Sequence, residues 1–175
     1  AASIKAAKTY LVFTMIGGAL FLAGIVWLKV LAGPLDFTTA GLLADIPNLD
    51  RTHLQMIFVL LIAGLGVKAA LFPLHGWLPV SMAAPAPVSS LLHAVAVVKA
   101  GAFGIVRVVY DIYGVEFTRD LGLTIFLAAL AAFTVVYGSI RALSQDDLKK
   151  RLAYSTVSQV SYIALGTAIA GPIAT

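Results

Sequence analysis

Long uncharged apolar runs constrain this sequence more than any other feature. Residues 9–28 and 121–140 are each 20 residues long without a charged side chain, and residues 152–175 form another such run. About 20 apolar residues in a helix cross the hydrocarbon core of a bilayer. Because lipid offers no partner to backbone N–H and C=O groups, a spanning segment must satisfy them internally as a helix. The sequence therefore predicts an all-α, polytopic transmembrane helix bundle.

Composition supports this fold class. The chain of 175 residues is 61% hydrophobic and 11% charged, whereas soluble domains carry about 25% charged residues. It has no cysteine and three scattered histidines, so it offers no disulfide framework and no zinc motif. We expect no metal, no cofactor and no catalytic chemistry on this chain. The net charge of +4 is interpreted as topology and mechanism rather than nucleic-acid binding.

The uncharged runs predict about five spans in a single transmembrane domain, 1–175. The predicted helices are about 9–30, 54–71 with a broken continuation to 79, 87–109, 121–140 and 152–170. Pro73 and Pro79 remove backbone donors, so we expect them to break or kink the second helix.

The charges between the spans predict an orientation. Basic residues precede the first span and separate the fourth from the fifth: Lys5, Lys8, Arg141, Lys149, Lys150 and Arg151. Five spans place the N-terminus and the loop 141–151 on one side, which the positive-inside rule makes cytoplasmic. The acid-rich connections 31–53 and 111–120 then face outward. We expect an integral protein of a prokaryotic inner membrane.

One lysine lies deep in a predicted span. Lys68 follows the uncharged residues 54–67, and an ionisable group at such depth is costly enough to indicate a functional site. A low dielectric disfavours a charged ammonium, so a lysine there can load and release a proton. The alternative is that Lys68 snorkels to the interface, or pairs with an acid on another helix to hold the bundle together.

Three further residues are candidates for a proton relay with Lys68. Lys99 lies near the middle of 87–109, and two charged lysines on adjacent helices repel, which favours handing a proton along. His75 follows Lys68 by seven residues, about two helical turns, so it would share its face. Two alternatives stay open. His75 hydrogen-bonds the backbone freed by the prolines, and His93 is a packed or water-bonded helix residue.

We assign structural roles to two other polar features of the sequence. The charged run 146–151 lies at a membrane edge, where we interpret it as a topogenic and helix-capping cluster. One side of the last span carries polar residues suited to interhelical hydrogen bonds or a file of water: Ser155, Ser158, Gln159, Ser161 and Tyr162. No glycine-rich phosphate loop, HExxH or G-x-S-x-G motif is present, so hydrolase and ATPase functions have no support.

Four motifs, in order, resemble one known family. They are G-V-K-A-A-L-F-P-L-H-G-W-L-P at 66–79, A-P-A-P-V-S-S-L-L-H-A at 84–94, V-K-A-G at 98–101 and D-L-K-K-R-L-A-Y-S-T-V-S-Q at 147–159. Through them, residues 54–163 closely resemble the antiporter-like subunits. These are the proton-translocating membrane subunits shared by respiratory complex I (NADH-quinone oxidoreductase), Mrp-type Na⁺/H⁺ antiporters and membrane-bound hydrogenases.

The resemblance implies roles that the residues alone do not give. It matches Lys68, and Lys99 on a broken helix, to the family's proton path near the membrane midplane, and it places His75 and His93 where polar relay residues often occur. It implies two inverted five-helix repeats, each with a broken helix, and this chain looks like one of them, a fragment of a longer bundle. The family's essential glutamate would precede residue 1, so we expect the acidic partner of Lys68 outside this chain.

These observations lead to one expected function and two alternatives. We expect a subunit that moves protons through intramembrane lysines, with other membrane subunits and the lipid bilayer as partners and with the driving reaction located elsewhere. One alternative is an Mrp-type antiporter subunit that exchanges Na⁺ for protons. The other is a non-conducting structural subunit of the same kind of complex. Na⁺-dependent transport would identify the first, and proton flux that survives neutralisation of both lysines would favour the second.

Overall fold

The computed structural model describes residues 2–33, 41–43, 46, 50–91 and 96–169, and every regular element among them is helical. The long helices are α1 (Ala2–Ala32), α2 (Arg51–Ala69), α7 (Leu123–Leu143) and α8 (Leu148–Ile169). Shorter elements lie between them: η1 (Leu74–Gly76), α3 (Trp77–Ser81), α4 (Ala86–Ser90), α5 (Val97–Arg107), the π-helix η3 (Val108–Tyr113) and α6 (Val115–Asp120).

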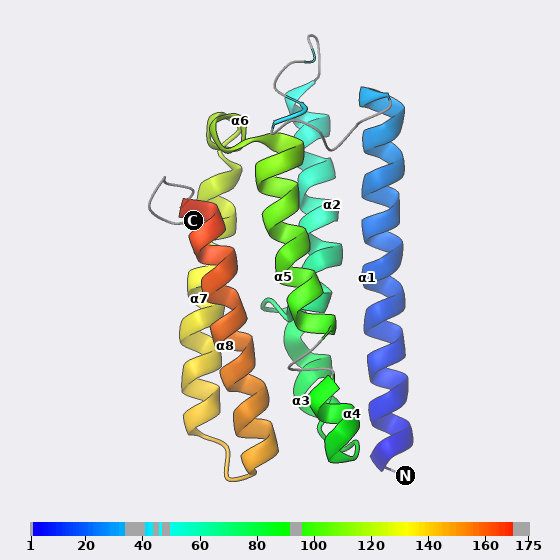
Figure 1. Cartoon of the computed structure of the whole chain (residues 1–175), viewed down its shortest axis with the longest axis vertical. Coiled ribbons are helices and arrows are strands. Elements are labelled where there is room, and N and C mark those ends of the chain that lie inside the picture. The colour runs from blue at the N-terminus through cyan, green and yellow to red at the C-terminus, as the bar shows by residue number, and fades with distance from the viewer. Residues whose placement is uncertain (1, 34–40, 44–45, 47–49, 92–95, 170–175) are drawn as a thin grey trace.

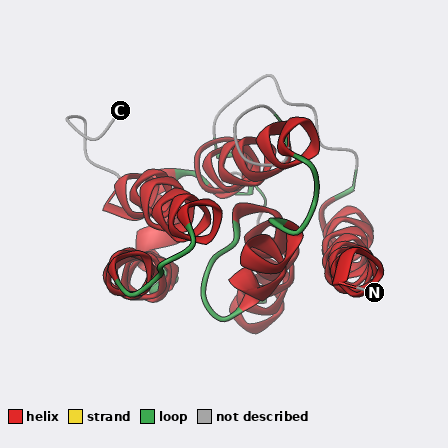
Figure 2. Cartoon of the chain, turned by 90° about the horizontal axis from the view of Figure 1, so that it is seen from below, coloured by secondary structure: helices red, strands yellow, loops and turns green. Residues whose placement is uncertain are grey.

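The helices stand side by side along one direction. In Figure 1, α1, α5 and α8 run one way, whereas α2 with α3 and α7 run the other way. The N-terminus and the turn between α7 and α8 lie at the same end, while the end of α1, the start of α2 and α6 lie at the opposite end. Seen end-on, the helices form separate columns, with the N-terminal helix at one edge (Figure 2). The two basic segments therefore share one end of the bundle.

The chain is an integral membrane protein. Among the described residues, three helical stretches are long and apolar enough to cross a bilayer: Ser3–Ala32, Arg51–Ser81 and Leu123–Leu143. Within the described residues, the third predicted span contains α4 and α5, which lie on either side of residues 92–95, and α5 continues directly into η3. The fifth predicted span, α8, is long enough, but Ser155, Ser158 and Gln159 lower its hydropathy.

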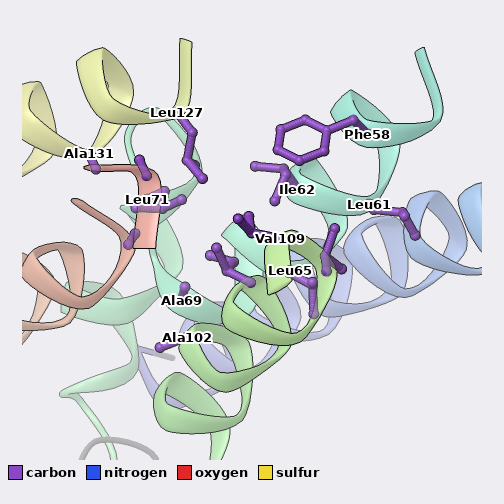
Figure 3. Packing of buried hydrophobic residues seen from close by; sticks show 14 of the residues in the cluster. Phe58, Leu61, Ile62, Leu65, Ala69, Leu71, Ala102, Val109, Leu127 and Ala131 are labelled. Atoms are coloured by element: carbon purple, nitrogen blue, oxygen red, sulfur yellow. The ribbon is translucent and has the colours of Figure 1, made fainter. Parts of the chain in front are cut away.

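Helix α2 forms the centre of the apolar core. Leu54, Ile57, Phe58 and Leu61 have at most 1% of their surface exposed. Figure 3 shows side chains of α2 meeting Val109 from η3 and Leu127 from α7. Helix α1, in contrast, leaves most of its large apolar side chains exposed, as expected of a helix at the edge of the bundle.

Small residues let the backbones of these helices approach closely. An ideal Cβ on Gly64 of α2 would lie 2.7 Å from the Gly17 carbonyl oxygen of α1 and 2.6 Å from Phe21 Cβ. A Cβ on Gly138 of α7 would lie 3.1 Å from the Ser158 amide nitrogen of α8. Close van der Waals contacts of this kind drive helix association in a membrane, where lipid leaves no hydrophobic driving force between helices.

The end of the bundle opposite the N-terminus is closed by backbone hydrogen bonds to η3. The amides of Gly41 and Leu42 donate to the Asp111 carbonyl at 2.9 and 3.2 Å, and the Leu43 amide donates to Ile112 O at 3.0 Å. The Tyr113 hydroxyl donates to the Leu54 carbonyl at 2.7 Å. Burial raises the pKa of the Tyr113 phenol, so it stays a neutral donor that joins η3 to the start of α2.

The contact at Gly64 gives a test of the fold. We predict that Gly64→Ala lowers the stability of the protein by about 1–3 kcal/mol, because overpacking at a close helix contact forces backbone shifts. Gly18→Ala is the matched control, since a Cβ at Gly18 meets nothing within 4 Å. Thermal unfolding of the purified parent complex in detergent measures both variants. Equal midpoints for the two would contradict the packing of α1 on α2.

Candidate functional site

The candidate site is organised around an interruption of the second span. Helix α2 ends at Ala69, and Ala70 adopts the left-handed conformation with φ 57° and ψ 39°. The interruption thus begins before Pro73, and helix resumes at η1 and α3. Pro79 does not break a helix, because it lies in the first turn of α3, where a missing N–H is tolerated.

Several backbone groups at the interruption have hydrogen-bond partners. The Leu71 amide donates to the Gly66 carbonyl at 2.9 Å, and the Trp77 indole Nε1 donates to Val67 O at 2.6 Å. The Phe72 amide donates to Thr134 Oγ1 of α7 at 3.1 Å. This explains how a broken helix persists at a depth where unpaired polar groups are costly.

Lys68 occupies the last turn of α2, directly before the interruption, and is partly buried. A Cβ added at Gly101 of α5 would clash with the Ala69 amide nitrogen and lie 2.8 Å from the Lys68 carbonyl carbon. Helix α5 therefore lies directly against the backbone of Lys68. Within the described residues, Lys68 makes no ion pair, and the salt bridge recorded there is Arg107 to Asp111 at 2.7 Å.

Lys99 stands in the first turn of α5, two residues before Gly101. The structure thus brings the two predicted lysines to adjacent helices, α2 and α5, which meet closely at Gly101 and Gly104. Their environments differ, because the Lys99 side chain is exposed whereas Lys68 is partly buried. His93, the fourth predicted relay residue, lies outside the described residues.

His75 lies beyond the interruption, in a cage of aromatic rings. Only 7% of its surface is exposed. Its ring stacks on Phe72 with centroids 5.6 Å apart and meets Tyr137 of α7 edge-on at 5.0 Å, with Tyr154 of α8 at 6.2 Å. Its Nδ1 atom is buried and has no hydrogen-bond partner among the described residues. Among the described residues, the hydrogen bonds to the freed backbone shown here are those of Trp77 and Thr134.

A cation stands next to this cage. The Arg141 guanidinium, near the end of α7, lies 5.5 Å from the centre of the Tyr154 ring. It also interacts electrostatically with the hydroxyls of Tyr154 and Tyr137. The sequence argument assigned Arg141 only to topology.

The polar side of α8 meets α7. Ser139 Oγ and Ser158 Oγ lie 2.9 Å apart, and Ser158 also donates to Val135 O at 3.1 Å. These are the interhelical hydrogen bonds expected of the last span. Ser155, Gln159 and Arg151 line a cleft of about 380 Å³ beside them. At the start of α8, Asp147 Oδ1 accepts from the Lys149 amide at 3.0 Å, which is the helix-capping role expected for the charged run.

Three site residues on α7 were not found from the sequence: Thr134, Tyr137 and Arg141. Each is a single polar residue near or within a long apolar run, so no motif marks it. The signal that could have found Thr134 and Tyr137 is their spacing of three residues, which puts both on one helix face.

The fold is an all-helical membrane bundle, and one of its spans is interrupted and carries a lysine. These features assign the chain to the polytopic membrane proteins that have polar sites within their spans. The whole chain, residues 1–175, matches the family described as NADH:quinone oxidoreductase/Mrp antiporter, transmembrane. The chain belongs to this family.

Similar proteins of known sequence are subunits of two kinds. The chain is 37% identical over 174 residues to NADH-quinone oxidoreductase subunit N of Desulforudis audaxviator, covering 98% of this chain and 34% of that protein. It is 40% identical over 162 residues to a putative antiporter subunit mnhA2 of Staphylococcus aureus, covering 90% of this chain and 19% of that protein. The chain therefore spans about a third or less of the length of these relatives.

Solved structures carry the same fold. A chain of the membrane-bound sulfane sulfur reductase, an archaeal respiratory membrane complex, matches with a TM-score of 0.82 and 34% identity, covering 95% of this chain and 34% of that one. A chain of the Mrp complex from Dietzia sp. matches with a TM-score of 0.81 and 33% identity, covering 97% and 18%. Both relatives are parts of multi-subunit membrane complexes.

The indole hydrogen bond at the interruption can be tested. We predict that Trp77→Phe lowers stability by about 1–3 kcal/mol, because the Val67 carbonyl loses its shorter hydrogen bond in a buried setting and keeps only the Ala70 amide as a donor. Trp27→Phe is the control, since Trp27 is only partly buried and packs on His53 at the other end of α2. Thermal unfolding of the parent complex measures both. If Trp77→Phe proves as mild as Trp27→Phe, the indole does not hold the interruption together.

Proposed function

We propose that this chain is part of a proton-translocating, antiporter-like subunit, in which protons move through the intramembrane lysines Lys68 and Lys99 with His75 and His93 as relay residues. The observation that carries the proposal is Lys68 itself. It stands partly buried at the end of a broken apolar helix, against the backbone at Gly101, and makes no ion pair within the described residues.

The chemistry of these groups supports a relay. A lysine ammonium can donate a proton and the resulting neutral amine can take one up again, and a second lysine lies on the adjacent helix. His75 lies just past the interruption, and its Nδ1 has no hydrogen-bond partner within the described part of the chain. An imidazole can accept a proton at one nitrogen and release it from the other. The membership of the family adds weight to this assignment.

We further propose the architecture and setting of the complete protein. The chain contributes five spans, two of them interrupted, which form one five-helix repeat within the single domain 1–175. The N-terminus and the loop 141–151 are cytoplasmic, in a prokaryotic inner membrane. Other membrane subunits surround it, as in the complexes to which its relatives belong, and the driving reaction takes place elsewhere.

An Mrp-type function, in which Na⁺ exchanges for protons, is the second candidate. It is favoured by the 40% identity to a putative antiporter subunit and by the match to the Mrp complex. A non-conducting structural role is the third candidate, and it requires that both lysines serve only the packing of the bundle.

Proton uptake by vesicles that contain the assembled parent complex tests the proposal. We predict that Lys68→Ala and Lys99→Ala each reduce uptake by about 10²-fold, the lower range for the loss of a proton-transferring group. Lys68→Arg should lose as much, because a guanidinium keeps the charge but does not release its proton. Lys150→Ala, in the exposed first turn of α8, is the matched control and should behave like the wild type.

The outcomes separate the three candidates. Unchanged uptake in Lys68→Ala and Lys99→Ala at equal assembly would assign this segment a structural role. Retained uptake in Lys68→Arg alone would mean that only the positive charge matters, not proton release. Uptake that requires Na⁺ on the opposite side of the membrane would identify the antiporter.

A further inference from the structure

The hydroxyl of Thr134 has an unusual place in the bundle. Thr134 lies in the middle of α7 with 0% of its surface exposed. Its hydroxyl donates to the Leu130 carbonyl of its own helix at 2.7 Å, a common arrangement for threonine in a helix. The oxygen retains acceptor capacity, and the Phe72 amide uses it at 3.1 Å.

Phe72 depends on this acceptor. Its neighbours Ala70 and Leu71 still donate to carbonyls of α2, at 3.3 Å to Val67 O and 2.9 Å to Gly66 O, and Pro73 has no N–H. Phe72 is thus the one residue of the interruption whose amide donates to another helix within the described part of the chain. An unpaired amide at this depth would be costly.

Phe72 is also part of the aromatic cage around His75. The Phe72 ring stacks on His75 with an interplanar angle of 22° and packs on Phe133 at 4.8 Å and Tyr137 at 5.1 Å. Phe133 and Tyr137 flank Thr134 on α7. One turn of α7 therefore fixes both the backbone and the ring of Phe72, and through the ring it fixes His75.

We propose that Thr134 is a positioning residue for proton transfer between Lys68 and His75. Its hydroxyl anchors the interruption that separates these two groups, so it sets where the imidazole stands relative to the end of α2. This inference rests on the proposed function, and it assigns α7 a role in that function although α7 carries no predicted relay residue.

The test compares three variants in vesicles that contain the assembled parent complex. Thr134→Val removes the acceptor at nearly constant volume, and Thr134→Ser keeps it. Thr167→Val is the matched control, because Thr167 is 5% exposed and donates to Ile163 O of its own helix at 2.8 Å. The readouts are the rate of proton uptake and the ratio of the rates in H₂O and D₂O.

We expect Thr134→Val to reduce uptake by about tenfold, the factor that corresponds to one buried hydrogen bond, and to raise the H₂O/D₂O ratio, because transfer past the interruption becomes slower. Thr134→Ser and Thr167→Val should match the wild type in both readouts. If Thr134→Val does not assemble, Thr134→Ala removes the hydroxyl with a smaller side chain and carries the same expectation.

Three results would overturn the inference: wild-type uptake in Thr134→Val, an equal loss in Thr134→Ser, or a loss with an unchanged H₂O/D₂O ratio, which would indicate only a structural role. Lys68→Ala in the same experiment distinguishes the two proposals. If Lys68→Ala loses uptake while Thr134→Val does not, only the positioning role fails, whereas unaffected Lys68→Ala removes the proposed function itself.

Discussion

The pairing of backbone hydrogen bonds at the interruption of α2 is the constraint on which the rest of the structure depends. A bilayer supplies no water to the N–H and C=O groups that a broken helix exposes. Here the Trp77 indole donates a hydrogen bond to the Val67 carbonyl, and the Thr134 hydroxyl accepts one from the Phe72 amide. Because one partner comes from beyond the break and the other from α7, the interruption exists only while α3 and α7 are in place.

This arrangement explains why polar chemistry gathers at one point of an apolar bundle. Lys68 ends α2 on one side of the interruption, and His75 lies on the other side within an aromatic cage. Gly101 lets α5 lie against the backbone of Lys68, which brings the helix that carries Lys99 alongside. Ionisable groups cost most in lipid, and the bundle places them where a broken helix already requires polar partners.

Much of the fold was predictable from the sequence, because uncharged runs of about 20 residues have few other ways to fold in a membrane. The ends were less predictable. Helix α1 begins at Ala2 and passes through Lys5 and Lys8, since lysine is a good helix former and these side chains are exposed. The interruption starts at Ala70, a residue that no propensity scale marks as a breaker, and not at Pro73.

The site was predictable only where residues stand in motifs. Lys68, Lys99 and His75 lie within the motifs on which the resemblance rests, and the structure confirms that Lys68 and Lys99 occupy helices that pack together. Thr134 and Tyr137 act through contacts with residues about 60 positions earlier in the chain, and no local pattern records such contacts. The π-helical turn at η3 was missed for the same reason, because its carbonyls are satisfied by residues 41–43.

The most direct test of the central claim observes the Lys68 side chain itself. Lysine ¹⁵Nζ signals of the assembled parent complex in lipid, with Lys68 assigned by its loss in Lys68→Arg, distinguish an ammonium from a neutral amine. The account predicts that the Lys68 signal changes between these two forms when the driving reaction is started and stopped. A signal that remains that of an ammonium under both conditions would contradict the account, because a lysine that never releases its proton does not relay one.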